Sequence, residues 1–420
     1  MAADEAEKAV VFYVGARRLV ALAGEILPGG MRVLAYAGED QPEGFLNGFV
    51  AHLDKAAKTV TRVFDKLKDS REGQFLKDAA GREIYVVLGN AKLSSYTFSS
   101  CQYYAAARKT LTHHDVHGVI EQTRSIATLP LTEHVLATLP SSFLVDDLDH
   151  VPDPVGLEAE RLGVTLKIYT MDGSEFKNLA KVFESAELEI KTFFPRMLAV
   201  SEAVLTERER QDGVLLLDLG SDCIYLSLWR GGMMTSTRIA EIGVKKLIEA
   251  VSQNWQIGFP DAAKVLDRYG SLVQEPDFGE ELIPLVVRDT QEKKQVERRV
   301  FHASLLKLSR DWLAEVLAEA DGFVRENGLF HPHYVFTGSG TRWDGFLEFL
   351  NKEFSTDARL GVLRSVEAPN ELKIHPGLSA AIGGLHLIAK FEKEKRQYLK
   401  SRGLVEKTLS QAREWLAAYF

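Results

Sequence analysis

Two strand-turn-strand segments with the same pattern constrain the fold of this chain more than any other feature. The first spans residues 10–25 and the second spans residues 214–229, and their tight turns carry Gly15 and Gly220. A later apolar strand ends in the turn Gly338-Ser339-Gly340. Because glycine lets backbone N–H groups approach an anion closely, the three turns predict a phosphate-binding cleft.

Two facing hairpins followed by a glycine-rich turn are typical of the actin/Hsp70-like ATPase fold. We therefore predict an α/β protein in which two large domains flank a nucleotide cleft, with a subdomain inserted in the first domain. The fold by itself does not establish activity. The predicted nucleotide-binding residues are Gly15, Ala16, Arg18, Asp218, Gly220, Ser221, Gly338, Ser339 and Gly340.

Length and composition narrow the functional classes. A chain of 420 residues suggests two to three domains. The net charge of -8 argues against broad nucleic-acid binding, which favours a basic surface. Cys101 and Cys223 are too few for a disulfide framework, which indicates a reducing cytoplasm. The acidic N-terminus has no signal-peptide pattern, and no apolar run approaches the roughly 20 residues needed to span a bilayer.

The regular alternation of strands and helices is interrupted over residues 90–160 by short strands and prolines, which indicates an inserted subdomain. Apolar periodicity predicts helices over residues 47–68, about 115–127, 173–186, 243–270 and 302–327. The predicted domains are 1–83, 164–210 and 370–390 for the first; 84–163 for the insertion; 211–245 and 331–369 for the second; 246–330 for its outer subdomain; and 391–420 for a tether and terminal helix.

The last residues of the chain form a separate pattern. Residues 386–420 hold eight basic and four acidic side chains, a net +4, so the remainder carries -12. Apolar residues then recur at helical spacing, which is typical of a helix lying in a membrane interface. The alternative is a helix docked on the body of the protein. The predicted membrane-binding residues are Val405, Leu409, Ala412, Trp415, Leu416, Tyr419 and Phe420.

The order of several segments resembles the FtsA family of actin-like bacterial division proteins, over nearly the whole chain. The segments that carry the resemblance are Val20 to Met31, Asp153 to Leu157 with Arg161-Leu162, Val204 to Arg210, and Glu414 to Phe420. The resemblance implies anchoring of FtsZ filaments to the inner face of the cytoplasmic membrane at the division site, and self-assembly into filaments. It also implies contacts of the inserted subdomain with other division proteins, and ATP with Mg²⁺ as cofactor.

The chain departs from the family pattern inside the hairpins. Tyr13 and Tyr225 stand where the family has acidic residues, Ala16 replaces a hydroxyl residue, and Arg18 replaces a lysine. Acidic side chains hold Mg²⁺ and its waters in this fold. Asp222 adds a carboxylate near the predicted phosphates, which would repel them unless a metal ion lies between. We therefore predict a weak ATPase at most, with nucleotide as a structural ligand that Arg18 can still bind.

Basic side chains cluster around the start of the predicted helix 302–327. The resemblance implies that this region receives the acidic C-terminal tail of FtsZ, since basic groups pair with carboxylates. The alternative is a solvated helix face. The predicted tail-binding residues are Arg298, Arg299, Lys307 and Arg310.

Two other functions are compatible with parts of the sequence. One is a PilM-like component of type IV pilus assembly, which has the same fold and binds a peptide of a membrane partner. Another is an ATP-dependent enzyme of the sugar-kinase branch, although Tyr13 and Tyr225 replace the carboxylates that it would need. His113, His114 and His117 lack the spacing of a metal site, and no metal ligand is predicted.

Overall fold

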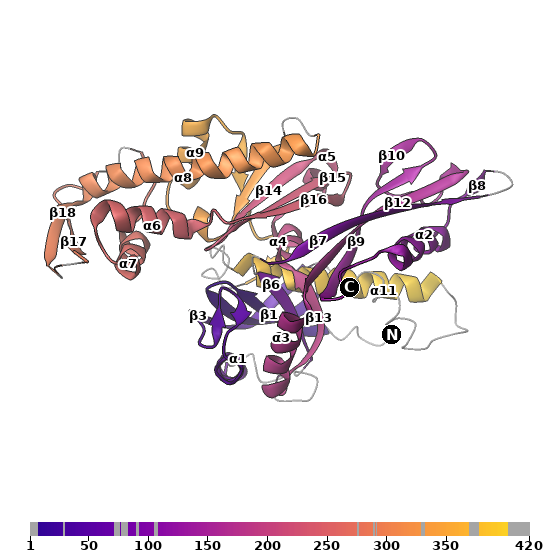
Figure 1. Ribbon diagram of the computed structural model, residues 1–420, viewed down its shortest axis with the longest axis horizontal. Helices are drawn as coiled ribbons and strands as arrows, with labels where there is room; N and C mark the ends of the chain where they lie inside the picture. The colour runs from indigo at the N-terminus through magenta and orange to yellow at the C-terminus, as the bar shows by residue number, and fades with distance from the viewer. Residues whose placement is uncertain are drawn as a thin grey trace.

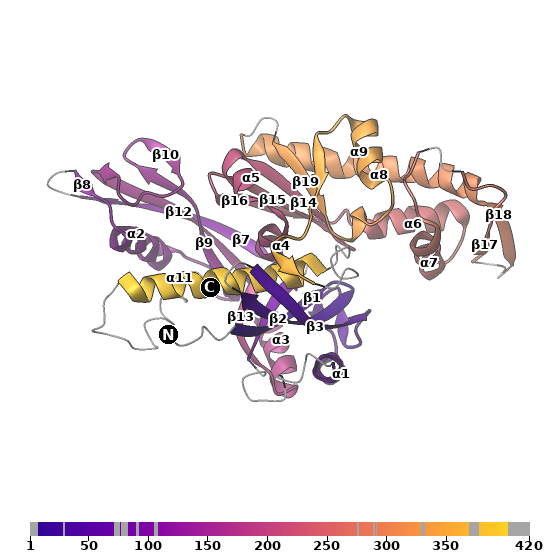
Figure 2. The same ribbon diagram turned by 180° about the vertical axis from the view of Figure 1, so that it is seen from behind.

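The computed structural model describes residues 7–27, 30–70, 76, 83–89, 92–104, 108–274, 277–288, 290, 292–328, 332–368 and 378–401, with side chains in the last helix described as far as Phe391. Two mixed β-sheets are stacked in layers, with helices between them and on both outer faces (Figure 1). An elongated subdomain projects from one side of the first domain, as the reverse view also shows (Figure 2).

The first sheet contains the first predicted hairpin, because β1 and β2 pair antiparallel on either side of the turn after Gly15. Strand β6 pairs parallel with β1, and β13 pairs parallel with β6. The strand order is β13 (Glu189–Pro195), β6 (Glu83–Gly89), β1 (Glu7–Gly15), β2 (Arg18–Leu27), β3 (Gly30–Asp40) and β21 (Val366–Glu367).

The second sheet repeats this arrangement with the second predicted hairpin at its centre. Strands β14 and β15 pair antiparallel, while β19 pairs parallel with β14. Both sheets thus place a parallel pair on one side of a hairpin and an antiparallel strand on the other, as the similar hairpin sequences predicted. The order is β16 (Met233–Ala240), β15 (Ile224–Arg230), β14 (Val214–Leu219), β19 (His333–Thr337) and β20 (Ala358–Leu360).

Helices fill the space between the sheets and cover their outer faces (Figure 1). Between the sheets lie α4 (Arg196–Val204) and α11 (Ser379–Ser401), which pack closely because a Cβ on Gly383 would overlap the backbone of Ala199. Gly383 therefore lies where the neighbouring backbone leaves no space for a side chain. The outer helices are α1 (Leu53–Lys68) and α3 (Gly173–Ser185) on the first sheet, and α6 (Val244–Trp255), α7 (Phe259–Tyr269), α8 (Arg298–Glu326) and α9 (Phe346–Phe354) on the second domain.

The inserted subdomain is built on a four-stranded antiparallel sheet with one helix on it. Its bounds differ from the predicted 84–163, because β6 pairs with β1 in the first sheet and β12 pairs with β7 and β9 in the inserted one. The elements are β10 (Leu148–Val151), β9 (Glu133–Val145), β12 (Arg161–Asp172), β7 (Ser94–Tyr103), the small pair β8 (Lys109–Thr110) and β11 (Glu158–Ala159), and α2 (His113–Ile126).

The remaining short elements complete both domains. Residues 47–52 were predicted as helix, but Asn47 and Gly48 adopt positive φ angles of 53° and 81°, which form a hairpin turn and delay α1 until Leu53. Among the described residues, no helix is long and apolar enough to cross a membrane. The short elements are β4 (Phe45–Leu46), β5 (Phe49–Val50), α5 (Glu207–Asp212), β17 (Leu282–Val286), β18 (Lys293–Glu297) and the 3-10 turn η3 (Ser339–Thr341).

Candidate functional site

The three predicted turns meet at one cavity of about 360 Å³ between the two domains. Six predicted residues line it: Gly15, Ala16, Arg18, Gly220, Ser221 and Ser339. The other three, Asp218, Gly338 and Gly340, do not line the cavity. Sequence reasoning missed six residues that also line it: Arg17 in the first glycine turn, Arg342 directly after the third, and Asp40, Gln41, Arg196 and Asp267 from other parts of the chain.

Arg196 forms the floor of this cavity. It is the first residue of α4, and its guanidinium makes a bidentate ion pair with Asp218 at the end of β14. Arg196 Nε donates to Asp218 Oδ2 at 2.6 Å, and Nη2 donates to Oδ1 at 2.7 Å. Both side chains are buried, at 9% and 2% exposed. Bidentate arginine–carboxylate pairs are among the stronger polar contacts in proteins, and this one accounts for both oxygens of Asp218.

Two tyrosines enclose the guanidinium. Its central carbon lies 5.4 Å from the ring centre of Tyr13 and 4.6 Å from that of Tyr225. Arg196 Nη1 donates to the Tyr13 hydroxyl, and the Tyr225 hydroxyl donates to the Gly89 carbonyl at 2.9 Å. Tyr13 and Gly89 belong to the first sheet, whereas Asp218 and Tyr225 belong to the second. We call the side chains of Tyr13, Arg196, Asp218 and Tyr225 the floor cluster. Together with the Gly89 carbonyl, the floor cluster joins the ends of both sheets.

Glycines make room for the floor cluster. A Cβ on Gly15 would lie 2.5 Å from the Tyr13 hydroxyl, and one on Gly89 would lie 2.7 Å from the Tyr13 ring. Gly338 has φ of 92°, and a Cβ there would overlap Asp218 Oδ1. Gly15 and Gly338 are thus required by contacts within the protein, whatever ligand the cleft holds.

The protonation states keep the floor cluster close to neutral. Burial raises the pKa of Tyr13 above its usual value, although the Arg196 cation acts in the opposite direction. Burial likewise raises the pKa of Tyr225 well above its usual value, so both phenols are neutral at physiological pH. Burial by itself would lower the pKa of Arg196, but the Asp218 carboxylate outweighs it and raises this pKa well above its usual value. One cation and one anion therefore balance within a water-poor space.

The residues at the floor do not fit a magnesium ion. Mg²⁺ takes oxygen ligands, usually from one or two carboxylates. Both oxygens of Asp218 already accept hydrogen bonds from Arg196, and the positions at which the resemblance implies acids are the neutral Tyr13 and Tyr225. Within the described ranges, no group of three or more His, Cys, Asp or Glu side chains is placed to hold a metal.

The turn after β14 also differs from a phosphate cradle. The carbonyls of Gly220, Ser221 and Asp222 accept hydrogen bonds from the N–H groups of Val244, Lys245 and Gly243, at 3.0, 2.8 and 3.2 Å. These donors open α6, so the turn caps that helix. A helix N-terminus is a ready anion site only while its N–H groups are available. This turn therefore supports the second domain instead of presenting α6 to a ligand.

The rim of the cavity carries paired charges. Arg18 lies 3.1 Å from Asp40, and Arg342 pairs with Asp267. Arg17, on the first hairpin, lies with its guanidinium carbon 5.4 Å from the ring centre of Phe259 on α7 and so bridges the two domains. An anionic ligand can therefore bind the arginines of the rim if it displaces the carboxylates that pair with Arg18 and Arg342.

The other predicted sites lie elsewhere. Arg298, Arg299, Lys307 and Arg310 all lie on α8. Three of them pair locally: Arg298 with Glu281, Arg299 with Glu297, and Arg310 with Glu353, whose Oε2 lies 2.6 Å from Arg310 Nε. Lys307 is exposed. The predicted membrane-binding residues Val405, Leu409, Ala412, Trp415, Leu416, Tyr419 and Phe420 lie outside the described residues.

Comparison with known proteins agrees with this architecture. Residues 94–170 match the family described as the SHS2 domain inserted in FTSA, and residues 215–383 match the family described as cell division protein FtsA. The cell division protein FtsA of Escherichia coli K12 is 22% identical over 419 residues, which cover 97% of this chain and 95% of the relative.

Two solved structures resemble the fold. The PilM-PilN type IV pilus biogenesis complex has a chain with a TM-score of 0.62 and 15% identity, which covers 91% of this chain and 98% of its own length. MreB 5 of Spiroplasma citri bound to AMPPNP has a TM-score of 0.51 and 12% identity, and the match covers 94% of this chain and 99% of the MreB 5 chain. The predicted actin-like ATPase fold is confirmed, and at these identities the structural likeness speaks only for the fold.

The floor cluster leads to a prediction about stability. Arg196→Met leaves the Asp218 carboxylate buried and unpaired, and removing one partner of a buried pair costs about 3–5 kcal/mol. We expect the midpoint of urea denaturation to fall accordingly. The double variant Arg196→Met/Asp218→Leu removes both charges and should recover a large part of that loss.

Arg342→Met provides a matched control at the rim of the same cavity. Its pair with Asp267 is solvent-exposed, at 41% and 59%, and exposed pairs contribute about 0–1 kcal/mol. A midpoint for Arg196→Met as high as that of Arg342→Met would contradict the structural role of the floor cluster.

Proposed function

Because this chain belongs to the FtsA family of cell division proteins, we propose that it anchors FtsZ filaments to the inner face of the cytoplasmic membrane at the division site. The observation that carries the proposal is the match to FtsA relatives over 97% of the chain, which includes the inserted SHS2 domain. A scaffold of this kind needs two attachment sites, one for the filament and one for the membrane.

The filament attachment is proposed to be on α8. The four proposed side chains, Arg298, Arg299, Lys307 and Arg310, lie in the first half of α8. This helix starts beside the β17–β18 pair at one end of the molecule (Figure 1). An acidic peptide can exchange for the local partners of Arg299 and Arg310, whose side chains are 74% and 51% exposed. Exposed ion pairs are weak, so this exchange costs little. The C-terminal tail of FtsZ is the acidic peptide that the family relationship suggests.

The membrane attachment is proposed for the C-terminal segment. Its apolar positions from Val405 to Tyr419 are spaced by 4, 3, 4 and 3 residues, and Trp415 and Phe420 widen this face. Such a segment binds by burying its apolar face at the headgroup boundary. The basic stretch between Lys390 and Arg402 precedes it and supplies attraction to anionic lipid.

Nucleotide is proposed as a structural ligand with little hydrolysis. The likeness to MreB 5 bound to AMPPNP supports a nucleotide in the cleft, where Arg17, Arg18 and Arg342 can meet its phosphates. A ligand that binds both domains would stabilise the closed cleft by mass action. We further propose that the closed form self-associates into actin-like filaments and that the inserted subdomain contacts other division proteins.

The α8 proposal predicts a loss of peptide binding. Lys307→Glu/Arg310→Glu should weaken binding of an FtsZ C-terminal tail peptide by roughly tenfold or more, or about 1.4 kcal/mol, because attraction becomes repulsion. Fluorescence anisotropy of a labelled peptide measures this change. Lys177→Glu is the control, because Lys177 is exposed on α3 of the other domain. An equal effect of both charge reversals would refute the α8 site.

The membrane proposal predicts that the full chain pellets with anionic liposomes and that Leu416→Glu does not, because a carboxylate interrupts the apolar face. Ser410→Glu is the matched control, since it adds the same charge outside the predicted apolar face. If the intact chain stays in the supernatant, the membrane proposal fails. The PilM-like alternative then gains support, because that function needs no terminal amphipathic helix.

A further inference from the structure

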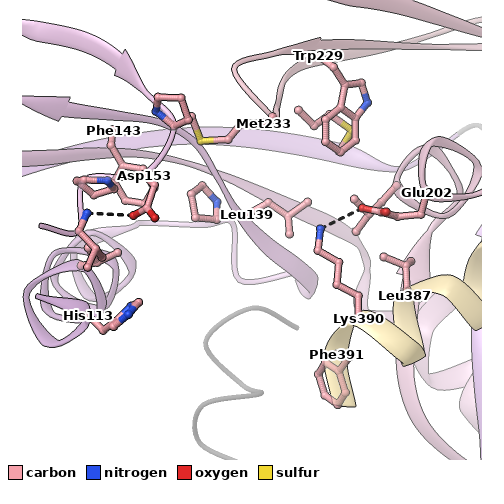
Figure 3. Close-up of a pocket in the computed structure, with 18 residues that line it drawn as sticks. His113, Leu139, Phe143, Asp153, Glu202, Trp229, Met233, Leu387, Lys390 and Phe391 are labelled. Carbon is pink, nitrogen blue, oxygen red and sulfur yellow. Dashed lines mark hydrogen bonds and ion pairs between the residues drawn. The ribbon is translucent and has the colours of Figure 1, made fainter. Parts of the chain in front are cut away.

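A second cavity, of about 290 Å³, lies where the inserted subdomain, the second sheet and α11 meet. Figure 3 shows its apolar side chains: Leu139 and Phe143 come from β9, Trp229 and Met233 from the second sheet, and Leu387 and Phe391 from α11. Small-molecule pockets usually have volumes of about 300–1,000 Å³. A cavity just below this range suits one or two large apolar side chains better than a cofactor.

The charged groups around this cavity are already neutralised. Glu202 is only 9% exposed and accepts a hydrogen bond from Arg210 at 2.8 Å. It also accepts one from Lys390 at 3.1 Å, which Figure 3 shows. Burial would raise the pKa of Glu202, but Lys390 and Arg210 outweigh it and keep the carboxylate ionised. Asp153 Oδ1 accepts from the Val155 N–H at 2.9 Å, while His113 is exposed. The cavity therefore selects an apolar occupant with little net charge.

We propose that this cavity receives the chain's own C-terminal segment, residues 404–420, when the segment is not on a membrane. Helix α11 borders the cavity at Leu387, Lys390 and Phe391, and its described part ends at Ser401. It extends past the first sheet on the side of the inserted subdomain (Figures 1 and 2). The segment is thus continuous in the chain with one wall of the cavity, and Leu404 follows Phe391 by thirteen residues.

The length of the segment allows it to return to the cavity. From Phe391 to Ser401, α11 advances ten residues, or about 15 Å at 1.5 Å per residue. Antiparallel helices are joined by loops of 2–5 residues, and Gly403 supplies a residue that readily ends a helix. A helix from Val405 to Leu416 covers twelve residues, or about 18 Å. Trp415 and Leu416 would therefore return to the level of Phe391.

The chemistry of the segment matches the cavity. Its apolar face ends in Trp415, Leu416, Tyr419 and Phe420, and its two acidic and two basic residues cancel. A neutral helix gains little from anionic lipid, so burial of its apolar face is its main driving force in either location. The cavity and the membrane then compete for the same side chains. This competition rests on the proposed membrane function, whereas docking in the cavity does not.

Cysteine cross-linking of the full chain without lipid tests the docking. In a Cys101→Ser background, His113→Cys at the cavity rim and Ala417→Cys in the segment are treated with a short bismaleimide. Cys223 remains a spectator, because it is buried and burial raises its pKa to about 11. We expect a link within one chain whose yield is unchanged on tenfold dilution, since tethered groups reach effective concentrations of about 1 mM.

Two comparisons make the cross-link decisive. Leu131→Cys replaces His113→Cys in the control pair, because Leu131 is fully exposed on the inserted subdomain and does not line the cavity. Leu416→Glu in the test pair should reduce the link to the level of this control. Absence of a link, equal linking in both pairs, or a link only between two chains would overturn the proposal. Because no vesicles are present, these outcomes are independent of whether the chain binds membranes.

Discussion

The buried ion pair between Arg196 and Asp218 is the contact on which the geometry of the cleft depends. It sits at the start of α4 and the end of β14, and through Tyr13 and Tyr225 it also involves the first hairpin and β6. Buried pairs add little net stability compared with apolar side chains of similar size, but they are costly to break. The pair therefore acts chiefly by fixing how the two sheets meet. In the sequence, Gly15 and Gly338 resemble ligand-binding glycines. In the structure, they lack a side chain because Tyr13 and Asp218 occupy the space that a Cβ would need.

A cleft held from within has consequences for the proposed function. Because protein side chains join the two domains, closure of the cleft does not depend on a metal-bound nucleotide. The protein can therefore lack ATP hydrolysis and still keep the shape of the cleft. An adaptor between filaments and a membrane needs a stable body with exposed binding sites more than it needs turnover. Control could then lie at the C-terminal segment, where the apolar cavity beside α11 offers a second location for the side chains that we propose to bind lipid.

Much of the architecture could be predicted because it is encoded in local patterns. The glycine hairpins indicated the paired sheets, and apolar periodicity indicated α3 and α8, although α8 begins earlier than predicted, at Arg298. Residues 47–52, predicted as helix, instead contain a turn and the short strand β5. Arg196 could not be predicted, because the sequence Phe-Phe-Pro-Arg carries no recognisable motif and only the tertiary structure brings it to Asp218. The one available signal was indirect: two tyrosines at expected acidic positions removed the usual charges and left Asp218 without a metal partner.

At the cleft floor, the internal Arg196 takes the place that a metal-bound ligand would otherwise hold beside Asp218. Isothermal titration calorimetry with AMPPNP, performed once with Mg²⁺ and once with EDTA, tests it most directly. We expect the affinity for AMPPNP to be the same with Mg²⁺ as with EDTA, because Asp218 remains bonded to Arg196 and does not bind the metal. A Mg²⁺-dependent gain in affinity of roughly tenfold or more, about 1.4 kcal/mol, would contradict it.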